Sequence, residues 1–449
     1  MIIDGHVLIA GAGVSGAGCA RMLVDLGVQA TVVDDDETAR FRVSEVTGAS
    51  NISPAEVRWE DYTCVVTSPG WRPSTPLLVD AAAHHLPVIG DVELAWRLDQ
   101  DGVFGEPHTW MVVTGTNGKT TTTAMLAEMM KRGPRTAAAV GNIGVAVGDA
   151  LTASPRIDVL VAELSSFQLH WSEQLTPAVG CVLNLAHDHI DWHGSFDAYA
   201  EAKMKALRGG VAIIGADDPE VVQRAGDAVG FTLGEPAANQ VGVVDGHIYD
   251  RAFGGGVIAP VEGISPPGPA GILDALAATA MARSKGITPE SIAAALANFQ
   301  VSGHRGQVVF QANGVSYIDN SKATNPHAAD AALEGHDSVI WIAGGQLKGA
   351  DIRPLLRKHA HRLKAALLLG VDRHSIAHEL ATIDPTIPVV MTDSVSPVEA
   401  MEELVAAARN LATPGDVVLL APAAASLDMF SGMSQRGNLF TQAAARSSV

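Results

Sequence analysis

The segment from Gly115 to Thr121 has the residue types and the spacing of a site that binds nucleotide phosphates. It follows a predicted strand at 110–113 and precedes a predicted helix at 121–131. Glycines let backbone N–H groups face a phosphate, a helix N-terminus and a lysine favour its negative charge, and a threonine hydroxyl reaches Mg²⁺. The segment is two residues shorter than the full GxxxxGK[ST] loop. Its place between a strand and a helix nevertheless favours phosphate binding over a simple turn.

Acidic and histidine side chains follow two further predicted strands. Glu163 comes directly after the strand at 158–162, and the stretch HDHIDWH at 187–193 follows the strand at 179–185. Open α/β sheets bind ligands at the carboxyl ends of strands, so these side chains are candidates for holding Mg²⁺, with zinc as the rival ion. From these residues alone, a metal site and a solvated polar loop fit the 187–193 stretch equally well. Lys203, on the next predicted helix, by itself reads as a surface lysine.

A glycine-rich turn, GAGVSG at 11–16, lies between a predicted strand at 6–9 and a predicted helix at 15–26. With Asp34 after the next strand, it matches the dinucleotide fingerprint GxGxxG. On its own this motif favours NAD binding. An NAD-dependent oxidoreductase and a nucleotide-binding regulatory module without chemistry are therefore two alternative functions.

Composition excludes several classes of partner. The 449 residues contain 30 Lys and Arg against 49 Asp and Glu, which gives a net charge of −19 without any basic run. Nucleic acids and anionic membranes need clustered cations, so we expect neither as a partner. The three cysteines include no CxxC pair, which argues against a disulfide framework and a thiolate zinc site. Without a signal-like N-terminus or an 18-residue apolar run, we expect a cytoplasmic protein with no membrane insertion.

The elements that must position these side chains form three blocks. In each block short apolar strands alternate with helical periodicity, which predicts an α/β fold of parallel sheets covered by helices. A length of 449 residues is compatible with about three domains. The polar stretch 99–107 is a candidate linker, 230–261 adds a small β part, and a hairpin at 308–318 opens the third block.

A series of motifs follows the order seen in the Mur ligase family, which the chain resembles over essentially its whole length. They are GTNGKTT, AELSSFQL, LNLAHDHID, YAEAK, GHR, DNSKATNP, GGQLKGAD and ASLDMF with QRGNLF. The SKATN, KGAD and SLD segments resemble those of members that add D-glutamate. The resemblance implies a Rossmann-like UDP-sugar domain at 1–98, a central P-loop ATPase-like domain at 99–301, and a Rossmann-like D-glutamate domain at 302–449.

The same resemblance implies an ATP-dependent ligase that adds D-glutamate to UDP-N-acetylmuramoyl-L-alanine through an acyl phosphate. The reaction would release ADP and phosphate during cytoplasmic synthesis of peptidoglycan precursors. Such chemistry depends mainly on charge neutralisation and alignment. The implied enzyme is a monomer that uses two Mg²⁺ ions. Its implied catalytic residues are Lys119, Glu163, His189 and Lys203, and its implied metal ligands are Thr120, Glu163, His189 and carbamylated Lys203.

The remaining site residues are also carried over from the resemblance. Those expected to bind ATP are Gly115, Thr116, Asn117, Gly118, Lys119, Thr120, Thr121, Asp274, Arg305, Asn320 and Lys322. Those expected to bind the other substrates are Ser15, Asp34, Asp35, Ser68, Gly70, Asn142, Ser165, Gln168, Thr324, Lys348, Ser426 and Leu427. The chain departs from the family at Asn320, where an aspartate is commoner, and at Gly271 and Asp274, which replace two asparagines near the adenine. These departures concern nucleotide contacts rather than the class of reaction.

Overall fold

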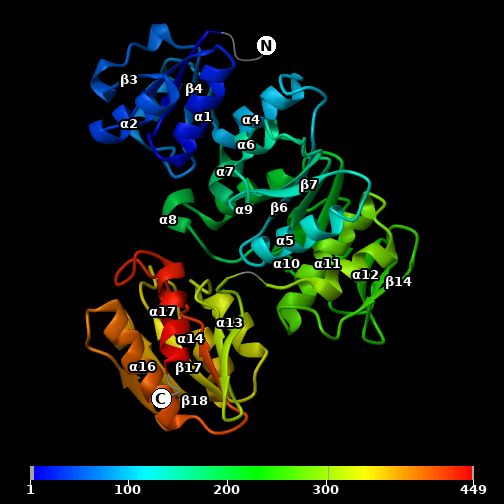
Figure 1. The fold of residues 1–449 in the computed structure, drawn as a ribbon, viewed down its shortest axis with the longest axis vertical. Coiled ribbons are helices and arrows are strands. Elements are labelled where there is room, and N and C mark those ends of the chain that lie inside the picture. The colour runs from blue at the N-terminus through cyan, green and yellow to red at the C-terminus, as the bar shows by residue number, and fades with distance from the viewer. Residues whose placement is uncertain (1–4, 302, 447–449) are drawn as a thin grey trace. The chain divides into compact units, whose positions relative to one another are not determined.

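The computed structural model describes residues 5–301 and 303–446, which form three sheets with helices around them (Figure 1). The chain divides into two compact units, one of residues up to 262 with 273–297, the other of 263–272 with 298 onward. The mixed α/β architecture confirms the predicted fold class. Each sheet falls within one of the three predicted ranges, while the domain boundaries themselves stay a prediction. No helix in the described ranges is long and apolar enough to span a bilayer.

The first sheet has five parallel strands in the order β3-β2-β1-β4-β5. Its strands are β1 His6–Ala10, β2 Gln29–Val33, β3 Ser50–Ile52, β4 Cys64–Thr67 and β5 Val88–Gly90, and its helices are α1 Val14–Asp25, α2 Glu37–Thr47, α3 Pro76–Ala83 and α4 Asp91–Gln100. Residues 7–10 are fully buried because the sheet is covered on both faces. The strand order reverses between β1 and β4, and such a switch point is where open α/β sheets bind ligands.

The second sheet has nine strands in the order β14-β13-β12-β11-β10-β9-β6-β8-β7. The pairs from β7 to β12 are parallel, and β13 and β14 are antiparallel additions, as expected for the small β part. The strands are β6 Thr109–Thr114, β7 Ala137–Gly141, β8 Val159–Glu163, β9 Val179–Val182, β10 Val211–Gly215, β11 Val229–Phe231, β12 Gln240–Val244, β13 His247–Asp250 and β14 Gly256–Pro260. The helices are α5 Lys119–Met130, α6 Val147–Leu151, α7 Ser166–His170, α8 Ile190–His193, α9 Phe196–Met204, α10 Pro219–Arg224, α11 Pro269–Ser284 and α12 Pro289–Asn298.

The first two sheets share one hydrophobic core. Val7 of β1 and Trp110 of β6 belong to the same buried cluster, with Leu98 of α4 among its members. A buried carboxylate also ties the two parts together, because Glu93 on α4 accepts hydrogen bonds from the backbone N–H groups of Gln174 and Leu175 over 2.9 and 3.2 Å. This packing explains why both sheets belong to a single compact unit.

The third sheet has the order β15-β16-β20-β17-β18-β19. Strands β15 and β16 form the expected antiparallel hairpin, and the other pairs are parallel. The strands are β15 Gln307–Ala312, β16 Val315–Asp319, β17 Val339–Gly344, β18 Leu363–Leu369, β19 Val389–Met391 and β20 Val417–Leu420, and the helices are α13 Pro326–Glu334, α14 Arg353–His359, α15 Arg373–Ile383, α16 Pro397–Leu411 and α17 Met433–Ala445. Separate apolar clusters cover its two faces.

Candidate active site around the phosphate loop

The phosphate loop runs from the end of β6 to the first turn of α5, as the sequence predicts. Gly118 has a φ of 82°, and a Cβ there would lie 2.3 Å from Asp274 Oδ1, so both the backbone and the available space require glycine. The Lys119 Nζ donates to the carbonyl oxygens of Gly115 and Thr116 over 2.9 and 2.7 Å. The Lys119 side chain therefore folds back over the loop that is predicted to bind phosphate.

Two side chains that sequence reasoning did not select hold this loop in place. The Asn184 side chain accepts from the Asn117 N–H over 2.8 Å and donates to the Asn117 carbonyl over 3.2 Å. The hydroxyls of Thr116 and Tyr199 lie 2.8 Å apart, so α9 also supports the loop. Asn184 and Tyr199 lie in the quoted LNLAHDHID and YAEAK motifs, which could have drawn attention to them.

Glu163 lies beside the loop because of the register of the sheet. Glu163 pairs with Val113 of β6, so it lies at the same carboxyl end of the sheet as the phosphate loop. The residue is 4% exposed, and its Oε2 has no hydrogen-bond partner among the described residues. A buried carboxylate oxygen without a donor is a suitable ligand for a hard cation.

Lys203 is buried against the phosphate loop, which corrects the reading of this residue as a solvated surface lysine. It is 2% exposed, and its Nζ donates to the Gly115 carbonyl over 2.7 Å and lies 3.4 Å from Thr114 Oγ1. Burial lowers the pKa of Lys203 well below its usual value, and the nearby Lys119 ammonium lowers it further. The loop is thus approached by two amines.

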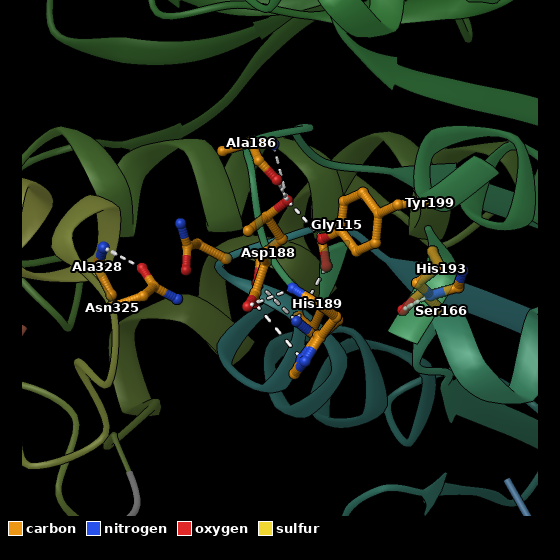
Figure 2. Close-up of polar contacts among 12 residues, drawn as sticks. Gly115, Ser166, Ala186, Asp188, His189, His193, Tyr199, Asn325 and Ala328 are labelled. Atoms are coloured by element: carbon orange, nitrogen blue, oxygen red, sulfur yellow. Dashed lines mark hydrogen bonds and ion pairs between the residues drawn. The ribbon is translucent and has the colours of Figure 1, made fainter. Parts of the chain in front are cut away.

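His189 lies at the start of the short helix α8, in a left-handed conformation with a φ of 52°. Its Nε2 is 3.6 Å from Asp188 Oδ2, and its ring packs 4.7 Å from that of Phe167. Figure 2 shows the Asp188–His189 pair in one close-up with Gly115 and Tyr199. Burial lowers the pKa of His189, and the Asp188 carboxylate opposes this shift.

The predicted metal ligands are compatible with an oxygen-preferring ion such as Mg²⁺. Within residues 5–301 and 303–446, no group of three His, Cys, Asp or Glu side chains could hold a metal ion. Of the four predicted metal ligands, only Glu163 and His189 are of those residue types. The other two are Thr120 and a carbamylated Lys203. The unpartnered Glu163 oxygen is the observation that suits Mg²⁺.

A cavity of about 150 Å³ borders the phosphate loop. Its lining residues are Leu183, Asn184, Gly215, Asp217, Asp218, Phe231, Leu273 and Asp274. Asp274, predicted to contact ATP, accepts from the Thr122 hydroxyl over 3.1 Å. The apolar lining of Leu183 and Phe231 was not expected, because Leu183 directly follows β9 while Phe231 ends β11, and this pairing leaves no local pattern.

The N-terminal turn is organised around Asp34. Its two carboxylate oxygens accept from the N–H groups of Ala12 and Asp36 over 2.7 and 2.9 Å. Burial raises the pKa of the partly buried Asp91 carboxyl, and a hydrogen bond with Ser15 opposes this shift. The Ser68 Oγ is buried without a partner among the described residues. These groups meet at the β1–β4 switch point, whereas Asp35, Gly70 and Asn142 are exposed.

Ser165 and Gln168 form a capping box at the start of α7. The Gln168 N–H donates to Ser165 Oγ over 3.2 Å, and the Ser165 N–H donates to Gln168 Oε1 over 3.0 Å. Their side chains therefore have a structural role in the helix. Beside them, the His193 Nε2 and Ser166 Oγ lie 3.0 Å apart (Figure 2).

In the second unit, the SKATN segment is joined to the loop that carries Arg305. The Lys322 N–H donates to the His304 carbonyl over 3.1 Å, and the His304 ring lies 2.6 Å from the buried Asp319 carboxylate. Asn325 accepts from the Ala328 N–H over 2.9 Å and thereby caps α13 (Figure 2). The expected ATP contacts Arg305, Asn320 and Lys322 thus come from adjacent loops.

The predicted D-glutamate residues come together at the ends of β17 and β20. The backbones of Gln346 and Ala425 exchange two hydrogen bonds of 2.9 Å. Lys348 follows shortly after Gln346 in the sequence, and Ser426 directly follows Ala425, so both residues flank this contact. Ser426 is buried and Leu427 is exposed, while Thr324 is partly buried.

Sequence reasoning missed Arg436, which supports these loops. It is fully buried and donates to the carbonyl oxygens of Ser321, Gly344 and Ala424 over 2.9, 3.3 and 3.2 Å. Burial lowers the pKa of Arg436 to about 10. The QRGNLF motif contains this arginine and was the available signal.

Comparison with known proteins gives consistent results. The chain matches the Mur ligase middle domain over residues 113–248 and the Mur ligase glutamate ligase domain over residues 304–424. It is 60% identical to the UDP-N-acetylmuramoylalanine--D-glutamate ligase of Corynebacterium efficiens, covering 98% of this chain and 94% of the relative. It is 47% identical to the protein of the same name from Mycolicibacterium smegmatis, covering 99% and 97%.

Two solved structures share the fold. The UDP-N-acetylmuramate-alanine ligase of Thermotoga maritima has a TM-score of 0.58 and 18% identity, covering 97% of this chain and 98% of that one. The MurF ligase of the same organism, in complex with ADP, has a TM-score of 0.60 and 16% identity, covering 93% and 95%.

Proposed function

This chain belongs to the Mur ligase family, and from that premise we propose that it is the ligase that joins D-glutamate to UDP-N-acetylmuramoyl-L-alanine with ATP. Relatives that are 60% and 47% identical over nearly the whole chain carry the name of that activity. One structural observation carries the proposal: Lys119, Lys203 and Glu163 all lie at the carboxyl end of β6.

The proposed reaction begins with attack of the substrate carboxylate on the γ-phosphate of ATP. This forms an acyl phosphate and ADP, after which the D-glutamate amine attacks the acyl carbon and phosphate leaves. Lys119 and the loop N–H groups hold the β- and γ-phosphates, because fixed positive charge stabilises the transferring group. Two Mg²⁺ ions, when bound, would supply further charge neutralisation, held by Thr120, Glu163, His189 and carbamylated Lys203.

Carbamylation of Lys203 is part of this proposal. An unmodified ammonium would repel both Lys119 and a metal ion, whereas the carbamate offers oxygen donors and a negative charge. The geometric support is that the Lys203 Nζ is buried 2.7 Å from the Gly115 carbonyl. The Glu163 carboxylate also acts on Lys203, since its charge raises the pKa of the lysine against the effect of burial.

Each predicted segment receives one role in the proposal. Residues 1–98 hold the UDP-sugar through Ser15, Asp34 and neighbouring turn residues, 99–301 bind ATP and metal, and 302–449 deliver D-glutamate through residues such as Lys348. A lysine beside the β17 end supplies the counter-charge that a side-chain carboxylate needs. The proposal also includes a cytoplasmic location, supported by three buried cysteines with free thiols, and a monomeric chain.

A phosphate-release assay tests the function. The purified chain, ATP, Mg²⁺ and UDP-N-acetylmuramoyl-L-alanine are combined with D-glutamate, L-glutamate, L-alanine, lysine or diaminopimelate as the amine. We expect phosphate release when the amine is D-glutamate and no release with any of the other four amines. Release with another amine in its place would make the substrate assignment wrong. A nicotinamide signal on adding NAD would favour the oxidoreductase alternative, which gives the phosphate loop no role.

A further inference from the structure

Two loops from different sheets are joined at the protein surface. The Arg72 guanidinium donates to Asp191 Oδ2 over 2.8 Å, and the Trp192 Nε1 donates to the Gly70 carbonyl over 3.2 Å. The first loop, residues 68–72, follows β4 and is named here the β4 loop. It carries residues proposed to hold the UDP-sugar. The partner residues lie on α8, directly after His189.

Trp192 is rigidly connected to His189. The backbone N–H groups of Trp192 and His193 both donate to the His189 carbonyl over 3.1 Å, so these residues form a single helical turn. The Trp192 side chain and His189 are therefore carried on the same helical turn.

The Trp192 ring also contacts the element that follows Glu163. Its centroid is 4.7 Å from that of Phe167 on α7, and the Phe167 ring is itself 4.7 Å from the His189 ring. The His170 ring meets Trp192 edge-on at 5.1 Å. One side chain thus touches the β4 loop, α7 and the turn of His189.

The ion pair alone is a weak connection. The Arg72 and Asp191 side chains are 52% and 74% exposed, and ion pairs of that kind contribute little stability. Trp192 is partly buried, and its ring packs against the rings of Phe167 and His170. This packing holds the Trp192 Nε1–H in place to donate to the Gly70 carbonyl. Trp192 is therefore the main connection, and the ion pair orients the β4 loop against it.

We propose that Trp192, assisted by Arg72 and Asp191, is a positioning residue that couples UDP-sugar binding at the β4 loop to nucleotide binding beside His189. This inference rests on the proposed function, because it needs both ligands to bind this chain. The buried contacts of Glu93 with residues 174 and 175 fix the two sheets independently of this coupling.

The test measures how one ligand changes the affinity of the other. Calorimetry on the full chain gives the dissociation constant of Mg²⁺ with a non-hydrolysable ATP analogue, with and without saturating UDP-N-acetylmuramoyl-L-alanine. In the unmodified chain we expect the sugar nucleotide to tighten analogue binding about fivefold, and the reciprocal titration to give the same factor. Trp192→Phe keeps a ring and removes the donor, so the factor should fall below about twofold.

A purely structural role would weaken each ligand measured alone, whereas a positioning role leaves those single affinities within about twofold and removes the coupling. Arg72→Ala should lower the factor as well. Trp59→Phe is the matched control, since Trp59 is also partly buried and stacks on a histidine, His84. Arg251→Ala controls for the ion pair, because its partner Glu235 is 68% exposed and Arg251 is 40% exposed. Both controls should keep the full factor.

The outcomes separate this inference from the proposed function. Coupling that survives in Trp192→Phe, that is absent from the unmodified chain, or that is lost equally in Trp59→Phe would overturn the inference alone. Failure of the unmodified chain to bind either ligand would overturn the proposed function and this inference with it.

Discussion

The Nζ atom of Lys203 lies 2.7 Å from the carbonyl oxygen of Gly115, so a buried lysine of α9 contacts the first residue of the phosphate loop. The Nζ atom of Lys119 lies 2.9 Å from the same oxygen. Both amines thus donate to one carbonyl oxygen, and in the proposed function the two side chains carry opposite charges. Lys119 stays a cation that faces phosphate, and Lys203 becomes an anion that faces metal.

This difference predicts how Lys203 responds to substitution. Arginine keeps the positive charge but cannot form the carbamate, so Lys203→Arg should be as inactive as Lys203→Ala, with a loss of at least about 100-fold in phosphate release. Native mass spectrometry in bicarbonate should detect the mass of one CO₂ on the chain that keeps Lys203 and none on either variant. Lys205→Arg, two residues further along, is the control and should stay active. An active Lys203→Arg would contradict the carbamate.

Lys119 should respond through its charge alone. Lys119→Ala removes the cation that neutralises the phosphates, and a preorganised charge of this kind typically contributes about 3 kcal/mol to the transition state, or about 100-fold in rate. Lys131→Ala, at the other end of α5, removes an exposed lysine paired with Glu128 and should leave the rate unchanged. Phosphate release measures both variants, and circular dichroism verifies that they are folded. Near-normal turnover of Lys119→Ala would refute the phosphate-loop assignment.

The phosphate loop and the strand ends were predictable from sequence because their determinants are local. Gly118 must be glycine for its own φ of 82°, and apolar runs identify buried strands wherever they pair. The position of Glu163 next to Val113 follows from strand order, which local sequence does not encode. The rule that ligands bind at the carboxyl ends of strands made Glu163 a candidate metal ligand, and the resemblance to a family assigned it to the same site as the phosphate loop.

The burial of Lys203 and Arg436 was not predictable in the same way. A lysine on a short helix is usually solvated, and Lys203 is buried only because α9 packs against the loop after β6. Arg436 satisfies its guanidinium with backbone carbonyls from three distant segments, which leaves no spacing or charge pattern to read. Buried polar groups bonded to remote backbone are therefore the part of this site that needed a structure.

Two glycines of α1 should give opposite effects on stability. A Cβ on Gly16 would lie 1.8 Å from the Gly11 carbonyl oxygen, so Gly16→Ala forces helix and turn apart and should destabilise the chain by about 1–3 kcal/mol. A Cβ on Gly18 would meet nothing within 4 Å, and Gly18→Ala should stabilise the helix by about 0.5–1 kcal/mol. Urea unfolding followed by tryptophan fluorescence measures both. Shifts of the same sign would show that α1 does not pack on the turn as described.

Asp416 should make the stability of the third sheet depend on pH. Its Oδ2 accepts from Lys364 Nζ over 2.5 Å and from the Thr413 N–H over 2.7 Å, and its Oδ1 accepts from the Ser338 hydroxyl over 2.7 Å. Burial alone would raise the pKa of Asp416, but these hydrogen bonds outweigh it and lower the pKa to about 2. The folded pKa lies below the unfolded value of about 3.9, so the carboxylate stabilises the fold above about pH 4. That contribution is lost as the pH falls from about 4 to about 2.

The shift corresponds to about 2 kcal/mol for a side chain that is 6% exposed. Asp416→Asn should therefore be less stable than the unmodified chain at pH 7 by a margin that shrinks by about 2 kcal/mol at pH 2. Hydrogen exchange of the β16 and β20 peptides, compared between the two chains at each pH, measures this margin. Asp337→Asn is the control, because the Asp337 carboxylate is fully exposed and 3.8 Å from Arg362. Its margin should stay near zero at every pH. A margin for Asp416→Asn that is constant from pH 7 to pH 2 would show that its carboxylate is not held in the charged form by Lys364, Thr413 and Ser338.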